Sequence, residues 1–110
     1  MTQAEVWDLR DKAAEAARML ALLANENRLL LLCHLVVAGE EAVGPLAASV
    51  GLSQSALSQH LSRLRADGLV ATRKVAQTVY YRIADPRVAA LLETLRNLYC
   101  PPDGDEIQKG

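Results

Sequence analysis

The 110-residue chain contains no phenylalanine, one tryptophan and three tyrosines, so leucine, valine and alanine must form most of its core. Such a composition favours helices. No apolar run approaches the roughly 20 residues that a membrane-spanning helix needs. The first residues, MTQAEVWDLRD, lack the apolar segment of a secretory signal. We therefore expect a cytoplasmic protein without membrane association, with one domain over residues 1–100 and a flexible polar tail over 101–110.

Cysteine is also scarce, with only Cys33 in LLLLCHLVV and Cys100 in LRNLYCPP. In the cytoplasm a disulfide is more often regulatory than structural. Taken alone, Cys33 among leucines and valines predicts a small buried core residue, and burial would raise its pKa. Cys100, beside two prolines at a predicted helix end, reads by itself as an incidental exposed thiol. Neither residue alone distinguishes packing, metal binding or a redox switch.

Net charge is low, at −1, but it is unevenly distributed. Residues 51–83 carry five basic side chains and a single acid, Asp67, whereas the segments on both sides are net acidic. A basic middle between acidic ends is typical of a surface that faces a polyanion. A solvated face with chance clustering is the alternative reading.

The pattern of apolar residues, caps and breakers predicts an ordered series of short elements. Helices are expected over residues 4–23, 26–38, 45–50, 54–67 and 86–99, and a hairpin over 69–75 and 78–83. Asn25, Ser53 and Asp85 are the expected N-caps, and Gly39 and Gly51 the expected stops. Two short helices joined at a glycine and followed by a hairpin describe a mainly α, winged helix-turn-helix fold.

The stretch LAASVGLSQSALSQHLSRL has the parts of a helix-turn-helix. Ala47 is small where two helices cross, and Gly51 suits the turn. Leu57, Leu61 and Leu64 share one helical face. The opposite face carries hydroxyl and amide side chains, which both donate to and accept from base edges and phosphates. The predicted DNA-reading residues are Gln54, Ser55, Ser58 and Gln59.

Further basic and polar residues flank this helix. His60 lies nearer the leucine face, where a hydrogen-bonded packing role is as plausible as a base contact. Arg63 points to the flank and suits a phosphate. At the hairpin tip, Arg73, Lys74 and Gln77 are expected to reach the DNA backbone or the minor groove.

The segment LSQSALSQHLSRLRADGLVATRKVAQTVYYRI resembles the DNA-binding core of the ArsR/SmtB family of winged-helix repressors, and the likeness runs from about Leu20 to Cys100. It implies a homodimer formed by the first and last helices, which binds an inverted-repeat operator in double-stranded DNA until an inducer acts. It also implies groove reading by the four serines and glutamines named above. The wing tip KVAQT departs from the family pattern because it has no glycine.

Many members of this family sense metals, but the ligand patterns are missing here. The segment GPLAASV has no Cys-x-Cys pair, and the last helix keeps Asp85 and Glu93 without a histidine. Zinc needs about four nitrogen or sulfur ligands, or three plus water. We expect no metal and no cofactor, although a site shared between subunits stays open as a less favoured metal(loid)-responsive alternative.

The positions of Cys33 and Cys100 resemble the dithiol subgroup of sulfide- and persulfide-responsive repressors, the BigR, SqrR and HlyU type. This resemblance implies that the thiols sense reactive sulfur by forming a disulfide or polysulfide bridge that releases the operator. A peroxide-responsive dithiol repressor and a HlyU-like activator or anti-silencer are the alternatives. An enzyme is not expected, because the chain has no Cys-x-x-Cys motif and no acid-base partner spaced near either thiol.

Overall fold

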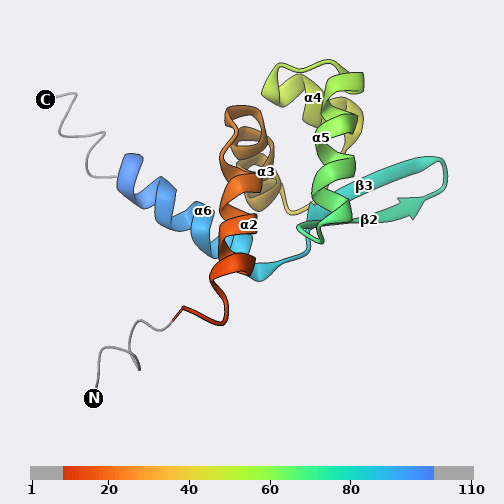
Figure 1. Cartoon of the computed structure of the whole chain (residues 1–110). Helices are drawn as coiled ribbons and strands as arrows, with labels where there is room; N and C mark the ends of the chain where they lie inside the picture. The colour runs from red at the N-terminus through yellow and green to blue at the C-terminus, as the bar shows by residue number, and fades with distance from the viewer. Residues whose placement is uncertain (1–8, 101–110) are drawn as a thin grey trace, which may run out of the picture.

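The computed structural model describes residues 9–100 (Figure 1). Its helices and strands follow the order α2, α3, β1, α4, α5, β2, β3, α6. The bounds are α2 Ala13–Leu23, α3 Glu26–Ala38, β1 Glu41–Ala42, α4 Val43–Val50, α5 Gln54–Ala66, β2 Val70–Val75, β3 Thr78–Ile83 and α6 Pro86–Tyr99. This order confirms the predicted winged helix-turn-helix.

Local capping chemistry sets most of the helix boundaries, as predicted. The Asn25 side chain accepts a hydrogen bond from the backbone N–H of Arg28 at 3.1 Å and so begins α3. Ser53 caps α5, and Asp85 caps α6 one residue before Pro86. Gly51 ends α4 in the left-handed conformation, with φ of 73°. The side chains of Asn25, Ser53 and Asp85 satisfy N–H groups that have no partner inside the helix, and the Gly51 N–H donates to the Ala47 carbonyl oxygen.

The start of the first helix differs from the prediction. Within the described residues α2 begins at Ala13, and Lys12, its N-cap, makes no side-chain capping bond. A turn precedes the helix, in which the Lys12 N–H donates to the Leu9 carbonyl oxygen at 2.9 Å. Without a capping side chain, alanine-rich composition alone does not fix where a helix starts. Residues 4–8 of the predicted helix and the predicted tail over 101–110 lie outside the described residues.

A three-stranded antiparallel sheet, in the order β1–β3–β2, forms the wing and its base. Strands β2 and β3 pair along their whole length, and they project away from α6 in Figure 1. The two-residue strand β1 was not predicted; its Glu41 and Ala42 pair with Tyr81 and Tyr80. At the glycine-free tip, Ala76 has φ of +55°, a conformation that glycine adopts more readily.

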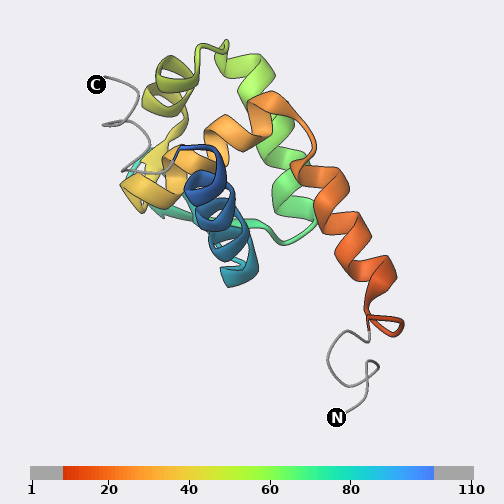
Figure 2. The ribbon, with the colours of Figure 1, turned by 90° about the vertical axis from the view of Figure 1, so that its left-hand side faces the viewer.

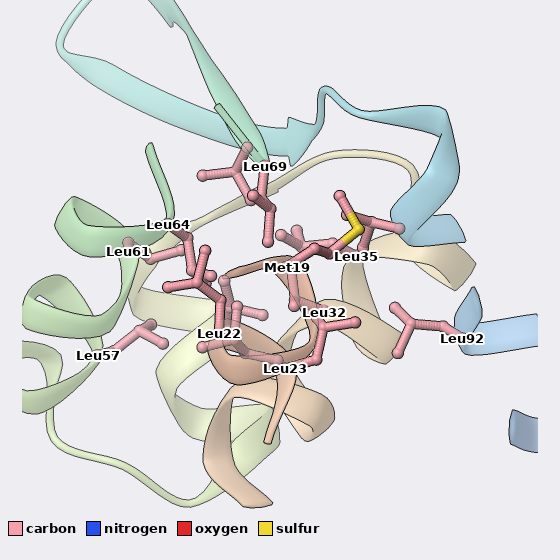
Figure 3. Packing of buried hydrophobic residues seen from close by; sticks show 14 of the residues in the cluster. Met19, Leu22, Leu23, Leu32, Leu35, Leu57, Leu61, Leu64, Leu69 and Leu92 are labelled. Atoms are coloured by element: carbon pink, nitrogen blue, oxygen red, sulfur yellow. The ribbon is translucent and has the colours of Figure 1, made fainter. Parts of the chain in front are cut away.

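Leucine side chains from every helix meet in one core (Figure 3). Leu57, Leu61 and Leu64 are fully buried, which confirms the predicted inner face of α5. The small Ala47 is buried in α4, at 3% exposure. From the other side, α6 crosses and packs against α3 (Figure 2). The core therefore fixes α5 from behind and leaves its other face outward.

Among residues 9–100, no single helix has the length and apolar character needed to cross a membrane. Only α2 and α3 taken together, bent by 94° at their junction, pass that test of length and composition.

Candidate functional site: an exposed polar helix and a pair of thiols

The outward face of α5 is polar and accessible. Gln54, Ser55, Ser58 and Gln59 are all exposed, and the leucines on the opposite face have no exposed surface. The predicted division of this helix into an outer polar face and an inner apolar face is therefore confirmed. Because its outer groups are hydroxyls and amides, the face offers both donors and acceptors to a groove.

His60 is half-buried between α5 and the start of α3. Its Nδ1 atom accepts a hydrogen bond from Arg28 Nε at 3.2 Å, and Arg28 Nη1 donates to the Leu22 carbonyl oxygen at 3.4 Å. This geometry requires an unprotonated Nδ1 on His60. Of the two roles that the sequence left open, the geometry matches a hydrogen bond that ties α5 to α2 and α3.

On the wing, one predicted residue already has a partner. Both Nε and Nη2 of Arg73 donate to the Glu40 carboxylate, at 2.8 and 2.7 Å, and the guanidinium lies 5.5 Å from the centre of the Tyr80 ring. The hydrogen bond from Arg73 holds the pKa of Glu40 below its usual value, against the opposing effect of desolvation. Lys74 and Gln77 lie exposed near the tip. Sequence reasoning missed Glu40, which is 33 residues away and carries no local signal.

The position of Cys33 contradicts the prediction that it is buried. Cys33 is exposed, whereas Leu31, Leu32 and Leu35 around it are buried. Successive helical residues turn by about 100°, so Cys33 falls on the outer strip of α3 with Leu30 and Val37. The apolar run was longer than the inward face of the helix, which is why sequence alone misplaced the thiol.

Cys100 lies just beyond α6, and its backbone N–H donates to the Arg96 carbonyl oxygen at 2.7 Å. It is exposed and its thiol is free. Partial desolvation raises the pKa of Cys33, and the negative charge of a Cys100 thiolate acts in the same direction. The two thiols are far apart in sequence, but the helices that carry them, α3 and α6, pack against each other.

A shallow groove of about 320 Å³ runs between α3 and α6 beside Cys33. It is lined by Cys33, Val36, Val37, Ala89, Leu92, Glu93 and Arg96. Its floor is mostly aliphatic, and its two charged residues have opposite signs. Within residues 9–100, no cluster of three or more histidine, cysteine or acidic side chains is placed to hold a metal ion.

Comparisons with known proteins agree with this geometry. A family model described as "Bacterial regulatory protein, arsR family" matches residues 25–72. The chain is 50% identical to the transcriptional activator HlyU of Vibrio cholerae over 93 residues, covering 84% of this chain and 85% of HlyU. It is 53% identical to the nodulation protein NolR of Rhizobium meliloti over 99 residues, covering 90% and 80% of the two chains.

Among solved structures, the transcriptional repressor BigR of Xylella fastidiosa superposes with a TM-score of 0.80 at 37% identity, covering 91% of this chain and 98% of BigR. The structure of reduced HlyU from Vibrio cholerae superposes with a TM-score of 0.78 at 49% identity, covering 84% of this chain and 97% of HlyU. The fold is thus shared with transcriptional regulators. The chain belongs to the ArsR family of DNA-binding transcriptional regulators.

Proposed function

We propose that this regulator is a repressor whose two cysteines sense reactive sulfur and release operator DNA. The polar face of α5 enters the major groove, and the wing contacts the backbone. The proposed DNA-binding residues are Gln54, Ser55, Ser58, Gln59, Arg63, Arg73, Lys74 and Gln77, and His60 helps to position α5 through its hydrogen bond with Arg28. The proposed sensing residues are Cys33 and Cys100.

The observation that carries the proposal is that both thiols are free and exposed, one on α3 and one at the end of α6, two helices that pack against each other. Two accessible thiols from separate elements, α3 and the end of α6, thus occupy one neighbourhood. A direct disulfide needs Cα atoms about 5.5–6 Å apart, and added sulfur atoms bridge a longer gap. A bridge would tie the end of α6 to the middle of α3 and change how these helices pack.

The chemistry balances without a further oxidant. One cysteine thiolate attacks the outer sulfur of a hydropersulfide, RSSH, and the thiol RSH leaves. The second thiolate then attacks the inner sulfur of the new cysteine persulfide, so that a disulfide forms and hydrogen sulfide leaves. The two thiols lose two electrons, and the sulfane sulfur takes them up to become sulfide. Each additional RSSH inserts one bridging sulfur and releases one RSH.

The proposed unit is a homodimer formed through α2 and α6. Leu20 on α2 is 56% exposed. It lines two neighbouring, mostly aliphatic hollows between α2 and α6, of about 380 and 390 Å³. A second copy that covers this face would place two α5 helices on an inverted-repeat operator, with half-sites about one helical turn apart. Small changes in α6 packing would then alter the spacing of the two helices.

The test measures operator affinity by fluorescence anisotropy before and after exposure to cysteine hydropersulfide. We expect affinity to fall about 5- to 150-fold, the range of a 1–3 kcal/mol coupling. In the reduced state, the Cys33→Ser and Cys100→Ser single variants should bind operator DNA with the affinity of the parent. After exposure to the hydropersulfide, both variants should keep that affinity. Release of DNA from the double variant to the same extent as from the parent would disprove the thiol switch. Intact mass distinguishes added bridging sulfur from loss of two hydrogens alone.

A second reading is favoured by the name of one relative, since HlyU of Vibrio cholerae is described as an activator. The same DNA-binding surface would then activate a gene by displacing another repressor. A promoter fusion in a strain with and without this gene separates the two: repression predicts higher expression in the deletion, and activation predicts lower expression.

Peroxide as the inducer would consume one H2O2, yield two waters and leave a disulfide without extra sulfur.

A further inference from the structure

A polar hollow of about 240 Å³ opens between α2, α3 and α5, apart from the residues proposed above to read bases. It is lined by Arg18, Ala21, Leu22, Arg28, Arg63 and Asp67. The three arginines come from three different helices, so the fold alone gathers them. Against three guanidinium groups there is one carboxylate, which leaves the lining with a net charge of +2.

The partners of these arginines leave the cationic charge in place. The Asp67 Oδ2 atom lies 3.6 Å from Arg63 Nε. Arg28 donates to two acceptors that carry no negative charge, His60 Nδ1 and the Leu22 carbonyl oxygen. Two acids near Arg18, Glu15 and Asp85, are both ion-paired with Arg87, at 2.8 and 2.7 Å. Arg18 itself is exposed on α2.

The hollow lies beside the outward face of α5. Arg63 follows Gln59 by four residues, so it lies one turn further along the same face, with 64% of its side chain exposed. A helix that occupies the major groove has a phosphate backbone along each flank. Arg63 therefore connects the proposed base-reading face to the hollow.

We infer that this hollow binds a phosphate group, and that the phosphate belongs to the DNA backbone flanking the groove entered by α5. Planar guanidinium groups match phosphate oxygens with paired hydrogen bonds, and three of them surround one space here. The inference extends the DNA contact to Arg18 and Arg28, neither of which belongs to the recognition helix or the wing. It rests on the DNA-binding half of the proposed function and not on the thiol switch.

The test is the salt dependence of operator binding by the reduced full-length chain. Arg18→Gln should lower affinity several-fold for operator and unrelated DNA alike, and reduce the slope of log K against log salt by about 0.9 for each phosphate that is no longer neutralised. Asp67→Asn, which removes the only carboxylate in the lining, should raise affinity at low salt. Lys12→Gln removes an equal charge from a side chain that is 74% exposed before α2 and outside the lining of the hollow, and it should leave the slope unchanged.

Equal slopes for the parent and Arg18→Gln, or an unchanged low-salt affinity for Asp67→Asn, would overturn the inference, even if persulfide still releases the DNA. Inorganic phosphate, titrated alone and followed by NMR of the arginine Nε–H groups, distinguishes the source of the ligand. Phosphate binding that Arg18→Gln abolishes, without any change in the DNA slope, would assign the hollow to a free phosphate compound and refute the backbone contact.

Discussion

Helices α3 and α5 are both 13 residues long and both bury a face of leucines, but their outer faces are opposite in character. The outer face of α5 carries serine and glutamine. The outer face of α3 carries Leu30, Cys33 and Val37, and Val37 is 84% exposed. Both inner faces are leucines buried in the same core. The outer faces differ, so they indicate what kind of molecule each helix can contact.

The two outer faces suit different chemistry. Hydroxyl and amide groups on α5 would replace the hydrogen bonds that base edges otherwise make to water. Exposed aliphatic groups on α3 favour another apolar surface over a polyanion. The contrast predicts that substitutions in the two regions have separable effects on DNA binding and on thiol chemistry.

The largest expected effect comes from breaking the packing behind α5. Leu61→Ala removes a fully buried side chain and should lower the free energy of unfolding by about 2–5 kcal/mol. The matched truncation on α3, Val37→Ala, removes methyl groups from an exposed residue. It should change the free energy of unfolding by no more than about 0.5 kcal/mol. Urea denaturation followed by circular dichroism measures both. Similar losses for the two variants would contradict the distinction between the buried and outer faces.

A smaller effect should separate DNA recognition from thiol reactivity. Gln59→Ala removes an exposed amide from the outer face of α5 and should weaken operator binding by about 1–3 kcal/mol, if that amide reads a base. Stability and the rate of Cys33 alkylation should stay at parental values. Anisotropy with operator and with unrelated DNA is the measurement, and an equal decrease on both would reassign Gln59 to a backbone contact.

The smallest effect sharpens the description of the thiol pair. Replacing Cys100 with serine removes a negative charge that raises the pKa of Cys33, so that pKa should fall while staying above its ordinary value because of desolvation. The rate of Cys33 alkylation by iodoacetamide should therefore begin to rise at a lower pH in the variant than in the parent. Mass spectrometry of the Cys33 peptide measures this rate. Unchanged pH profiles would mean that the thiols do not interact.

Local sequence patterns predicted most of the fold. Asn25 and Ser53 cap helices through side chains that reach three residues along the chain, so a short sequence window contains all the information needed. The leucine spacing of α5 likewise predicted its buried face. Strand β1 was missed because two residues carry no periodicity, and its partner strand lies far along the chain.

The candidate site was less predictable, because its geometry depends on distant residues. The pairing of Arg73 with Glu40 joins the wing to the loop after α3, and the local sequence around either residue does not predict it. The exposure of Cys33 depended on which leucines of a continuous apolar run face inward. Residue types predicted the kind of chemistry at each position, but packing decided which side chains meet.

Helix α3 touches every part of this proposed machinery. Near its beginning Arg28 bonds to α5, midway it carries Cys33, and beyond its end Glu40 holds the wing through Arg73. At 1.5 Å per residue, these attachments lie along a rod of about 20 Å. Because a short helix moves nearly as a rigid body, one displacement at the thiol would shift both of its ends, and with them α5 and the wing. The two elements proposed to contact DNA would then lose their register together, and release would be cooperative within a single subunit.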